Sequence, residues 1–302
     1  MKKTGIITLA LGLVFTASSF AADITASGVL VQSLQVGSKR QAAVADTYDF
    51  GKSRLTLNLK ADDKVSVTYI GKLESNLSMD YIYADILTDL GKVRAGVIYD
   101  QIANFGGGIY QTNTFLANTT TKEKGLALYT KLANVNIGIF NILAPIEAQT
   151  TRVYGAKLDT TMDALYLGAV VKSAATKNKL GLAAEVEASY KIGAGKISAQ
   201  YYTDLNNNSA VLFQGEAKKQ AFLGLYGEYN LASLIGYGVG VYADYVGAAN
   251  TDTVSPWAQS QSKIGAKYSV NPKATVYYEL VSTKFKNVDA VGTSGLGLQI
   301  NF

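Results

Sequence analysis

The sequence has 302 residues, with 28 Lys and Arg against 23 Asp and Glu for a formal net charge of +5, and it contains neither Cys nor His. Without Cys there is no disulfide and no thiol chemistry, and without His the commonest general base and metal ligand are missing. We therefore expect no enzyme that pairs a nucleophile with a His base, no cofactor and no metal. The 20 Tyr, 29 Gly and only 3 Pro are typical of a chain made mostly of strands.

The first 21 residues have the pattern of a secretory signal peptide. Lys2 and Lys3 precede an apolar run and a small-residue segment that ends at Ala21. We expect cleavage after Ala21, with an N-terminal anchor helix as the alternative, and residues 22–302 as one barrel domain. No later segment has the about 18 apolar residues that a spanning helix needs, so this domain would cross a membrane with strands.

From Asp23 onward the sequence alternates apolar and polar residues in segments of about ten residues, the length of a tilted membrane-crossing strand. The clearest segments are 54–60, 180–192 and 237–245. In the second of these, Val186 lies on the apolar face, and Glu185 and Glu187 lie on the polar face. Alternation alone does not separate a membrane barrel from a soluble sandwich, because both have one apolar face.

The connections alternate between short turns and longer polar links. Seven turns are expected, at 61–63, 89–91, 133–134, 159–163, 193–195, 232–235 and 271–273. Eight links lie between them, at 37–49, 75–77, 101–124, 144–150, 172–178, 205–215, 247–261 and 286–292. These fifteen connections predict an all-β fold, a sixteen-stranded antiparallel transmembrane β-barrel with tight turns at one end and loops at the other. Pairing of the last strand, which ends at Phe302, with the first would close the cylinder, although any β protein can end in a strand.

The positions of the charged residues predict which face of the strands contacts water. Because Lys or Arg on the lipid face costs about 2–4 kcal/mol at the bilayer midplane, the charged face must look into the lumen. The early strands then place a basic set inside: Lys52, Arg54, Lys60, Lys64, Lys72, Lys92 and Arg94, against Glu74 and Asp85. The later strands contribute a mixed set: Glu185, Glu187, Glu228, Asp244, Glu279, Lys191, Lys263 and Lys267. For any single one of these residues, a solvated charge with no selective role is the alternative.

Several stretches resemble the general diffusion porins of Gram-negative outer membranes. Phe50–Leu55 (FGKSRL) is similar to a second-strand segment, and Asp89–Gly96 (DLGKVRAG) is similar to a fifth strand. Asn104–Gly107 (NFGG) is similar to the turn of an inward-folded third loop, and Phe302 matches the family's C-terminal assembly signal. The long segment 101–121 that contains this turn is of a length uncommon in a loop without a function.

The resemblance implies a water-filled channel for passive diffusion of small hydrophilic solutes, located in the outer membrane and built as a homotrimer with an inward-folded third loop. Its constriction and lumen wall would comprise Lys52, Arg54, Lys60, Lys72, Lys92, Arg94, Asn104, Phe105, Gly106, Gly107 and Lys131. The expected partners are membrane lipids and lipopolysaccharide, small hydrophilic solutes and anions; nothing indicates a nucleic acid.

Two departures from the family modify these expectations. Asn104 and Gly108 stand where such porins have acidic residues, and segment 101–121 carries no charge. We therefore expect the pore to favour anions. The second loop is reduced to about 75–77, too short for the usual latch between subunits. A substrate-specific anion or sugar channel and a non-conducting structural or adhesin barrel are the alternatives.

An interfacial girdle is expected from seven tyrosines near strand ends on the apolar face, with ordinary packing as the alternative. They are Tyr69, Tyr99, Tyr190, Tyr229, Tyr237, Tyr245 and Tyr268.

Overall fold

The computed structural model describes ten segments of the chain. They are residues 23–37, 47–49, 53–73, 77–99, 122–146, 149–175, 180–204, 221–248, 258–285 and 290–302. The predicted signal peptide and the predicted third loop lie outside the described residues, as does most of the second loop.

These segments contain seventeen strands and one short helix. The strands of the first half are β1 (Asp23–Gly37), β2 (Thr47–Asp49), β3 (Arg54–Lys60), β4 (Val65–Leu73), β5 (Leu77–Thr88), β6 (Gly91–Tyr99), β7 (Lys122–Leu132), β8 (Val135–Ile146) and β9 (Gln149–Met162). The second half contains β10 (Leu165–Ala175), β11 (Leu180–Ile192), β12 (Gly195–Asp204), β13 (Ala221–Asn230), α3 (Ala232–Ile235), β14 (Val239–Ala248), β15 (Ala258–Asn271), β16 (Ala274–Phe285) and β17 (Val291–Asn301).

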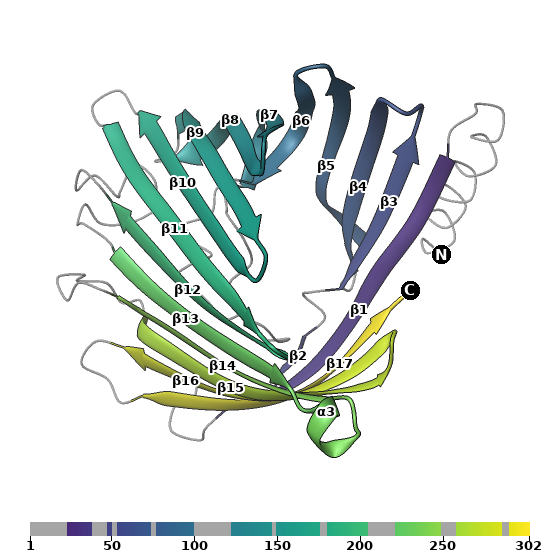
Figure 1. The fold of residues 1–302 in the computed structure, drawn as a ribbon, viewed down its shortest axis with the longest axis vertical. Helices are drawn as coiled ribbons and strands as arrows, with labels where there is room; N and C mark the ends of the chain where they lie inside the picture. Colours follow the sequence, from purple (N-terminus) through teal and green to yellow (C-terminus); the bar gives the residue numbers. More distant parts are fainter. Residues whose placement is uncertain are drawn as a thin grey trace.

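The strands form one antiparallel sheet that closes on itself (Figure 1). From β3 onward each strand pairs with the next along the chain, and β1 pairs with both β17 and β3. Both β2 and β3 lie along β1, with Asp49 opposite Ser33 and Arg54 opposite Val29, so they are two parts of one interrupted strand. Sixteen strands therefore surround the lumen, which confirms the predicted fold. Within the described segments, no helix is long and apolar enough to cross a membrane.

Seven short connections lie at one end of the barrel, because successive strands alternate in direction. They are residues 61–64, 89–90, 133–134, 163–164, 193–194, 231–238 and 272–273. We call this the turn end and the opposite side the loop end. The prediction that the fourth turn begins at Asp159 is wrong. Asp159 lies within β9 opposite Gly168, and Asn136 donates a hydrogen bond of 2.7 Å to its Oδ2. The turn begins at Asp163, whose φ of 51° suits a tight hairpin.

Large apolar side chains cover the outer face of the barrel. Examples that are each at least 38% exposed are Ile86, Leu126, Ile139, Leu158, Leu167, Val186, Ile197, Leu225, Ile264, Leu280 and Leu296. On the same strand as Val186, Glu185 and Glu187 are only 2% and 5% exposed and face the opposite way. The predicted alternation is confirmed in this strand, and the polar face is the inner one.

The tyrosines predicted for the girdle are mostly on the outer face. Five are exposed there: Tyr190, Tyr229, Tyr237, Tyr245 and Tyr268. Tyr69 is half-buried, and the side chain of Tyr99 lies outside the described residues.

The seam between β1 and β17 closes the sheet. Nine residue pairs join the two strands, from Val29 opposite Asn301 to Gly37 opposite Thr293. Beyond them, the Gly28 amide donates a hydrogen bond of 3.0 Å to the Phe302 carbonyl oxygen, and the Phe302 amide donates one of 3.1 Å to the Gly28 carbonyl oxygen. The Phe302 ring covers Gly28 so closely that a Cβ there would meet the ring, with Cε2 at 2.7 Å. The absence of a side chain at Gly28 therefore makes room for the Phe302 ring.

Replacing Gly28 by Ala should weaken this closure. The new methyl group would collide with the Phe302 ring and approach the Arg54 carbonyl oxygen to 2.8 Å. We expect a loss of about 1–3 kcal/mol in the free energy of unfolding, because the added carbon overpacks the seam. Urea unfolding in lipid vesicles measures it. Gly227→Ala is the control, because a Cβ there meets nothing within 4 Å. Equal free energies of unfolding for the two variants would contradict this packing role of Gly28.

Candidate pore lining

One group of charged side chains lies on the inner wall at β5 and β6, and we call it the turn-side cluster. The Arg94 guanidinium spans the Asp85 carboxylate, with Nε 2.7 Å from Oδ1 and Nη2 2.7 Å from Oδ2, and Lys92 Nζ lies 3.5 Å from Oδ2. The Arg94 Cζ atom lies 3.7 Å from the centre of the Tyr83 ring and 5.6 Å from that of Tyr129. A two-pronged ion pair and ring stacking hold the guanidinium against the wall.

A second group, the loop-side cluster, lies nearer the loop end on β3, β4 and β5. Arg54 Nε donates a hydrogen bond of 2.8 Å to Asp80 Oδ2, and Lys72 Nζ lies 4.0 Å from the other carboxylate oxygen of Asp80. Arg54 and Lys72 face each other across β3 and β4. The Asp80 side chain is only 6% exposed and is therefore almost fully buried.

Asp80 faces the lumen because of a β-bulge. Ile70 pairs with Tyr81 but Gly71 pairs with Met79, so Asp80 is the extra residue in β5. Counted by strict alternation from Asp85, Asp80 would point into lipid; the bulge turns it inward. This residue was not predicted from the sequence. The available signal was the cost of a carboxylate on the lipid face, since a charge out of phase with its strand indicates a bulge.

The two clusters together carry a smaller positive charge than the predicted basic wall. Four cations, Arg54, Lys72, Lys92 and Arg94, share two carboxylates, Asp80 and Asp85, which leaves two positive charges in this part of the described wall. Asp80 thus supplies part of the negative charge that segment 101–121 lacks.

The inner wall formed by β13 to β16 pairs its charges locally. Lys263 Nζ lies 2.8 Å from Asp244 Oδ2, and Lys267 Nζ lies 3.0 Å from Glu228 Oε2. The Tyr226 hydroxyl donates a further hydrogen bond of 2.9 Å to Glu228. Because cations and carboxylates alternate here, these pairs add little net field to the lumen.

Inward aromatic residues lie opposite glycines on the neighbouring strand. The pairs in register are Tyr83 with Gly96, Tyr129 with Gly138, Phe140 with Gly155, Tyr242 with Gly265 and Tyr277 with Gly297. At Gly138, Gly155 and Gly265 an added Cβ would touch ring atoms of the paired aromatic residue. A missing side chain thus lets each of these rings lie flat on the wall, which keeps it out of the lumen.

An apolar patch covers the inner wall near the loop end. Its members, each at most 6% exposed, include Ile98, Phe140, Ile142, Val153, Val170, Phe222 and Val246. Ile98 has the inward phase of Arg94 on β6, and Ile142 pairs with Val153. This patch was not predicted from the sequence. The apolar run at 137–143, where alternation fails, was the available signal.

The remaining predicted site residues are not brought together. Lys60 is at the turn end, where its Nζ lies 2.6 Å from Asp63 Oδ1 and holds the pKa of that carboxyl below its usual value. Lys131 is exposed beside the turn at 133–134. The other predicted members lie outside the described residues: Lys52, Asn104, Phe105, Gly106 and Gly107.

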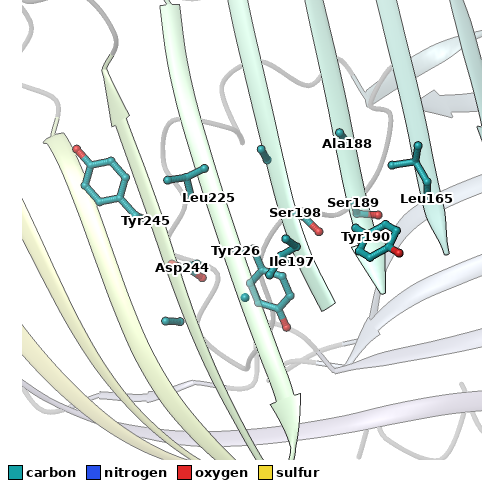
Figure 2. A pocket seen from close by; sticks show the side chains of 13 residues that line it. Leu165, Ala188, Ser189, Tyr190, Ile197, Ser198, Leu225, Tyr226, Asp244 and Tyr245 are labelled. Carbon is teal, nitrogen blue, oxygen red and sulfur yellow. The ribbon is translucent and has the colours of Figure 1, made fainter. Parts of the chain in front are cut away.

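A hollow of about 520 Å³ lies on the outer face across β10 to β14 (Figure 2). Small residues form its floor: Ala188, Ala199, Gly227 and Ala243. Larger outward side chains surround it: Leu165, Tyr190, Ile197, Leu225 and Tyr245. The hollow therefore opens toward lipid and is not on a path through the lumen.

Comparison with solved structures relates the fold to known outer-membrane proteins. The outer-membrane channel DcaP of Acinetobacter baumannii superposes with a TM-score of 0.71 at 12% identity, covering 93% of this chain and 97% of DcaP. An anion-selective porin from Comamonas acidovorans gives 0.64 at 14% identity, covering 93% and 100%. The trimer form of OmpT, an outer-membrane protein of Vibrio cholerae, gives 0.66 at 15% identity, covering 93% and 100%.

At these identities the similarity establishes a shared fold. No protein-family model matches the sequence. No curated protein matches it either. The function must therefore be argued from the wall itself.

Replacing Gly138 by Val should push the Tyr129 ring off the wall. A Cβ at Gly138 would already lie 3.1 and 3.2 Å from two Tyr129 ring atoms, and Val adds two more carbons. The displaced ring would move away from Lys92 and Arg94 into the lumen. We expect a lower single-channel conductance in planar bilayers and a stability loss of about 1–3 kcal/mol. Gly227→Val, which fills open space on the outer face, is the control. A folded Gly138→Val variant with unchanged conductance would refute the role of the glycine.

Proposed function

We propose that the protein is an outer-membrane porin that forms a water-filled channel for passive diffusion of small hydrophilic solutes and ions, with a modest preference for anions. The observation that carries this proposal is the charged inner wall of a closed sixteen-stranded barrel, a size wide enough for an aqueous channel. The porin and channel folds among the solved structures support it. We assign no catalytic role to the chain.

The third loop, residues 101–121, is proposed to fold into the lumen and narrow it. The inner apolar patch supports this, because side chains that face an open aqueous lumen would not be almost fully buried. Ile98, at 0% exposure, lies two residues before Asp100 and hence next to the start of this segment. The loop sequence contains apolar residues that could cover the patch: Phe105, Ile109, Tyr110, Phe115 and Leu116.

The preference for anions is proposed to come from the two charge clusters. Their net positive charge attracts anions, and a low-dielectric cylinder focuses that field. Because Asp80 and Asp85 are ion-paired with the same cations, the preference should be weaker than four free cations would produce. The Comamonas porin, which shares the fold, is anion-selective, and this is compatible with the proposal.

The oligomeric state and the cellular location are part of the same proposal. We propose a homotrimer, supported by the trimer form of the Vibrio OmpT structure, without the usual second-loop latch. Residues 1–21 are proposed to be a cleaved signal peptide for secretion through the inner membrane, and the mature chain is proposed to lie in the outer membrane among lipids and lipopolysaccharide.

A carbohydrate-specific channel is the second candidate function, favoured by inward tyrosines that were not identified as a track from the sequence. The half-buried ones are Tyr83, Tyr129, Tyr166 and Tyr277. Aromatic faces combined with carboxylates are typical of polar ligand sites with an apolar component. Concentration-dependent block of the ion current by a neutral oligosaccharide would favour this candidate over unselective diffusion.

Purified protein in planar bilayers tests the proposed function. We expect stepwise conductance and, under a KCl gradient, a reversal potential that favours Cl⁻. Absence of conductance by folded protein would refute the channel and favour a structural or adhesin barrel. Conductance that favours K⁺ would refute the proposed selectivity alone.

Charge changes in the clusters should move selectivity in opposite directions. The double variant Asp80→Asn and Asp85→Asn should raise the permeability ratio of Cl⁻ to K⁺ about twofold, because two compensating charges are removed. Arg94→Glu should lower or reverse the preference. The control is the double variant Asp89→Asn and Asp163→Asn in two turns, which removes the same two negative charges outside both clusters. If the reversal potential shifted as much in the control as in the cluster variants for the same change in total charge, the assignment of selectivity to the two clusters would be contradicted.

A further inference from the structure

The connection between β13 and β14 differs from the other connections at the turn end. It spans residues 231–238 and contains α3, whereas the other six described turns have two to four residues. Its sequence, Leu-Ala-Ser-Leu-Ile-Gly-Tyr-Gly, has no charged residue. Leu234 is 69% exposed, Ile235 is 48% and Tyr237 is 66%, so three large apolar side chains face outward from one short segment. Figure 1 shows α3 projecting from the rim of the barrel, away from the space that the strands enclose.

Part of the backbone of this segment is hydrogen-bonded within the segment. The Asn230 side chain accepts a hydrogen bond of 2.9 Å from the Ala232 amide. The amides of Leu234 and Ile235 both donate to the Leu231 carbonyl oxygen, at 2.8 and 3.0 Å. Gly236, with a φ of 73°, ends the helix and donates a hydrogen bond of 2.9 Å to Ala232. This pairing reduces the number of backbone groups that would be left unsatisfied if the segment moved from water into the membrane interface.

The apolar surface of α3 continues the outer face of the barrel. Tyr229 precedes it on β13, and Tyr268 on β15 lies opposite Val239, the first residue of β14. Both tyrosines are exposed on the outer face, together with Val270. The outer hollow of Figure 2, which spans β10 to β14, includes Leu225 on β13 and Tyr245 on β14, farther from α3 along these two strands. The outward residues of these two strands between the hollow and the helix are all uncharged.

We propose that α3 is an interfacial membrane anchor, which inserts Leu234, Ile235 and Tyr237 into the boundary between headgroups and acyl chains of the leaflet at the turn end. The occupant of this surface is lipid, because the apolar face is continuous with the lipid-facing wall. The tyrosines at residues 229, 237 and 268 suit the headgroup level, where amphipathic rings are enriched. The anchor would fix the depth of this side of the barrel. It depends on the barrel being in a membrane and not on conduction.

A single Trp reporter tests the anchor. Trp257 is the only Trp in the chain, so Trp257→Phe removes the background and Tyr237→Trp places the probe on the anchor. The full chain is folded into vesicles whose lipids carry bromine either near the headgroup or at the acyl-chain end. We expect blue-shifted emission and quenching by shallow bromine that is about threefold stronger than for the control. The control is Lys273→Trp in the polar turn between β15 and β16.

Adding Leu234→Glu and Ile235→Glu to the reporter should shift its emission toward that of water and lower the quenching to the control level. Equal quenching at residues 237 and 273 from the start would overturn the proposal. Blue-shifted emission without quenching at any depth would overturn it in favour of a protein contact, such as a second copy. Single-channel conductance is measured separately, so failure of the anchor and failure of the proposed channel are distinguishable.

Discussion

The constraint on which the structure depends is that backbone amides and carbonyls in hydrocarbon have no water to pair with. A sheet in a membrane meets this requirement only by closing on itself. The pairing of β1 with β17 is therefore the contact that completes the barrel. The seam extends to the last residue of the sequence, where Phe302 exchanges two backbone hydrogen bonds with Gly28 and covers it with its ring.

Closure gives the sheet a polar inner face and an apolar outer face. The positions of the charged side chains on the wall follow from this division. Where alternation fails to supply the correct face, the backbone changes. The bulge at Asp80 is the clearest case, because one extra residue in β5 turns a carboxylate from lipid to the Arg54 side of the wall. The cost of that bulge is local, whereas a carboxylate in hydrocarbon would be penalised for as long as the barrel is in the membrane.

The inner wall combines features with different consequences for transport. Ion pairs hold Arg94 and Arg54 flat, which reduces both their reach and their net field. Glycines such as Gly138 let rings lie flat and preserve width. The apolar patch near the loop end makes part of the inner wall uncharged. Solved outer-membrane structures with 12–15% identity share the architecture, and at that identity the fold alone is shared, so this chain's properties must be sought in its own wall.

The sequence by itself determined the strand number, the inner and outer faces and the end at which the turns lie, because period-two alternation and turn residues are local signals with a large hydrophobic consequence. It also indicated Arg54 and Arg94 as wall residues. Only the tertiary structure decided which charges meet. Asp80 required a bulge that alternation cannot show, Lys60 found a partner in its own turn, and inward residues such as Ile142 became buried through neighbours distant in sequence. Register across strands and contacts across the lumen depend on closure of the whole sheet, and no local pattern contains that information.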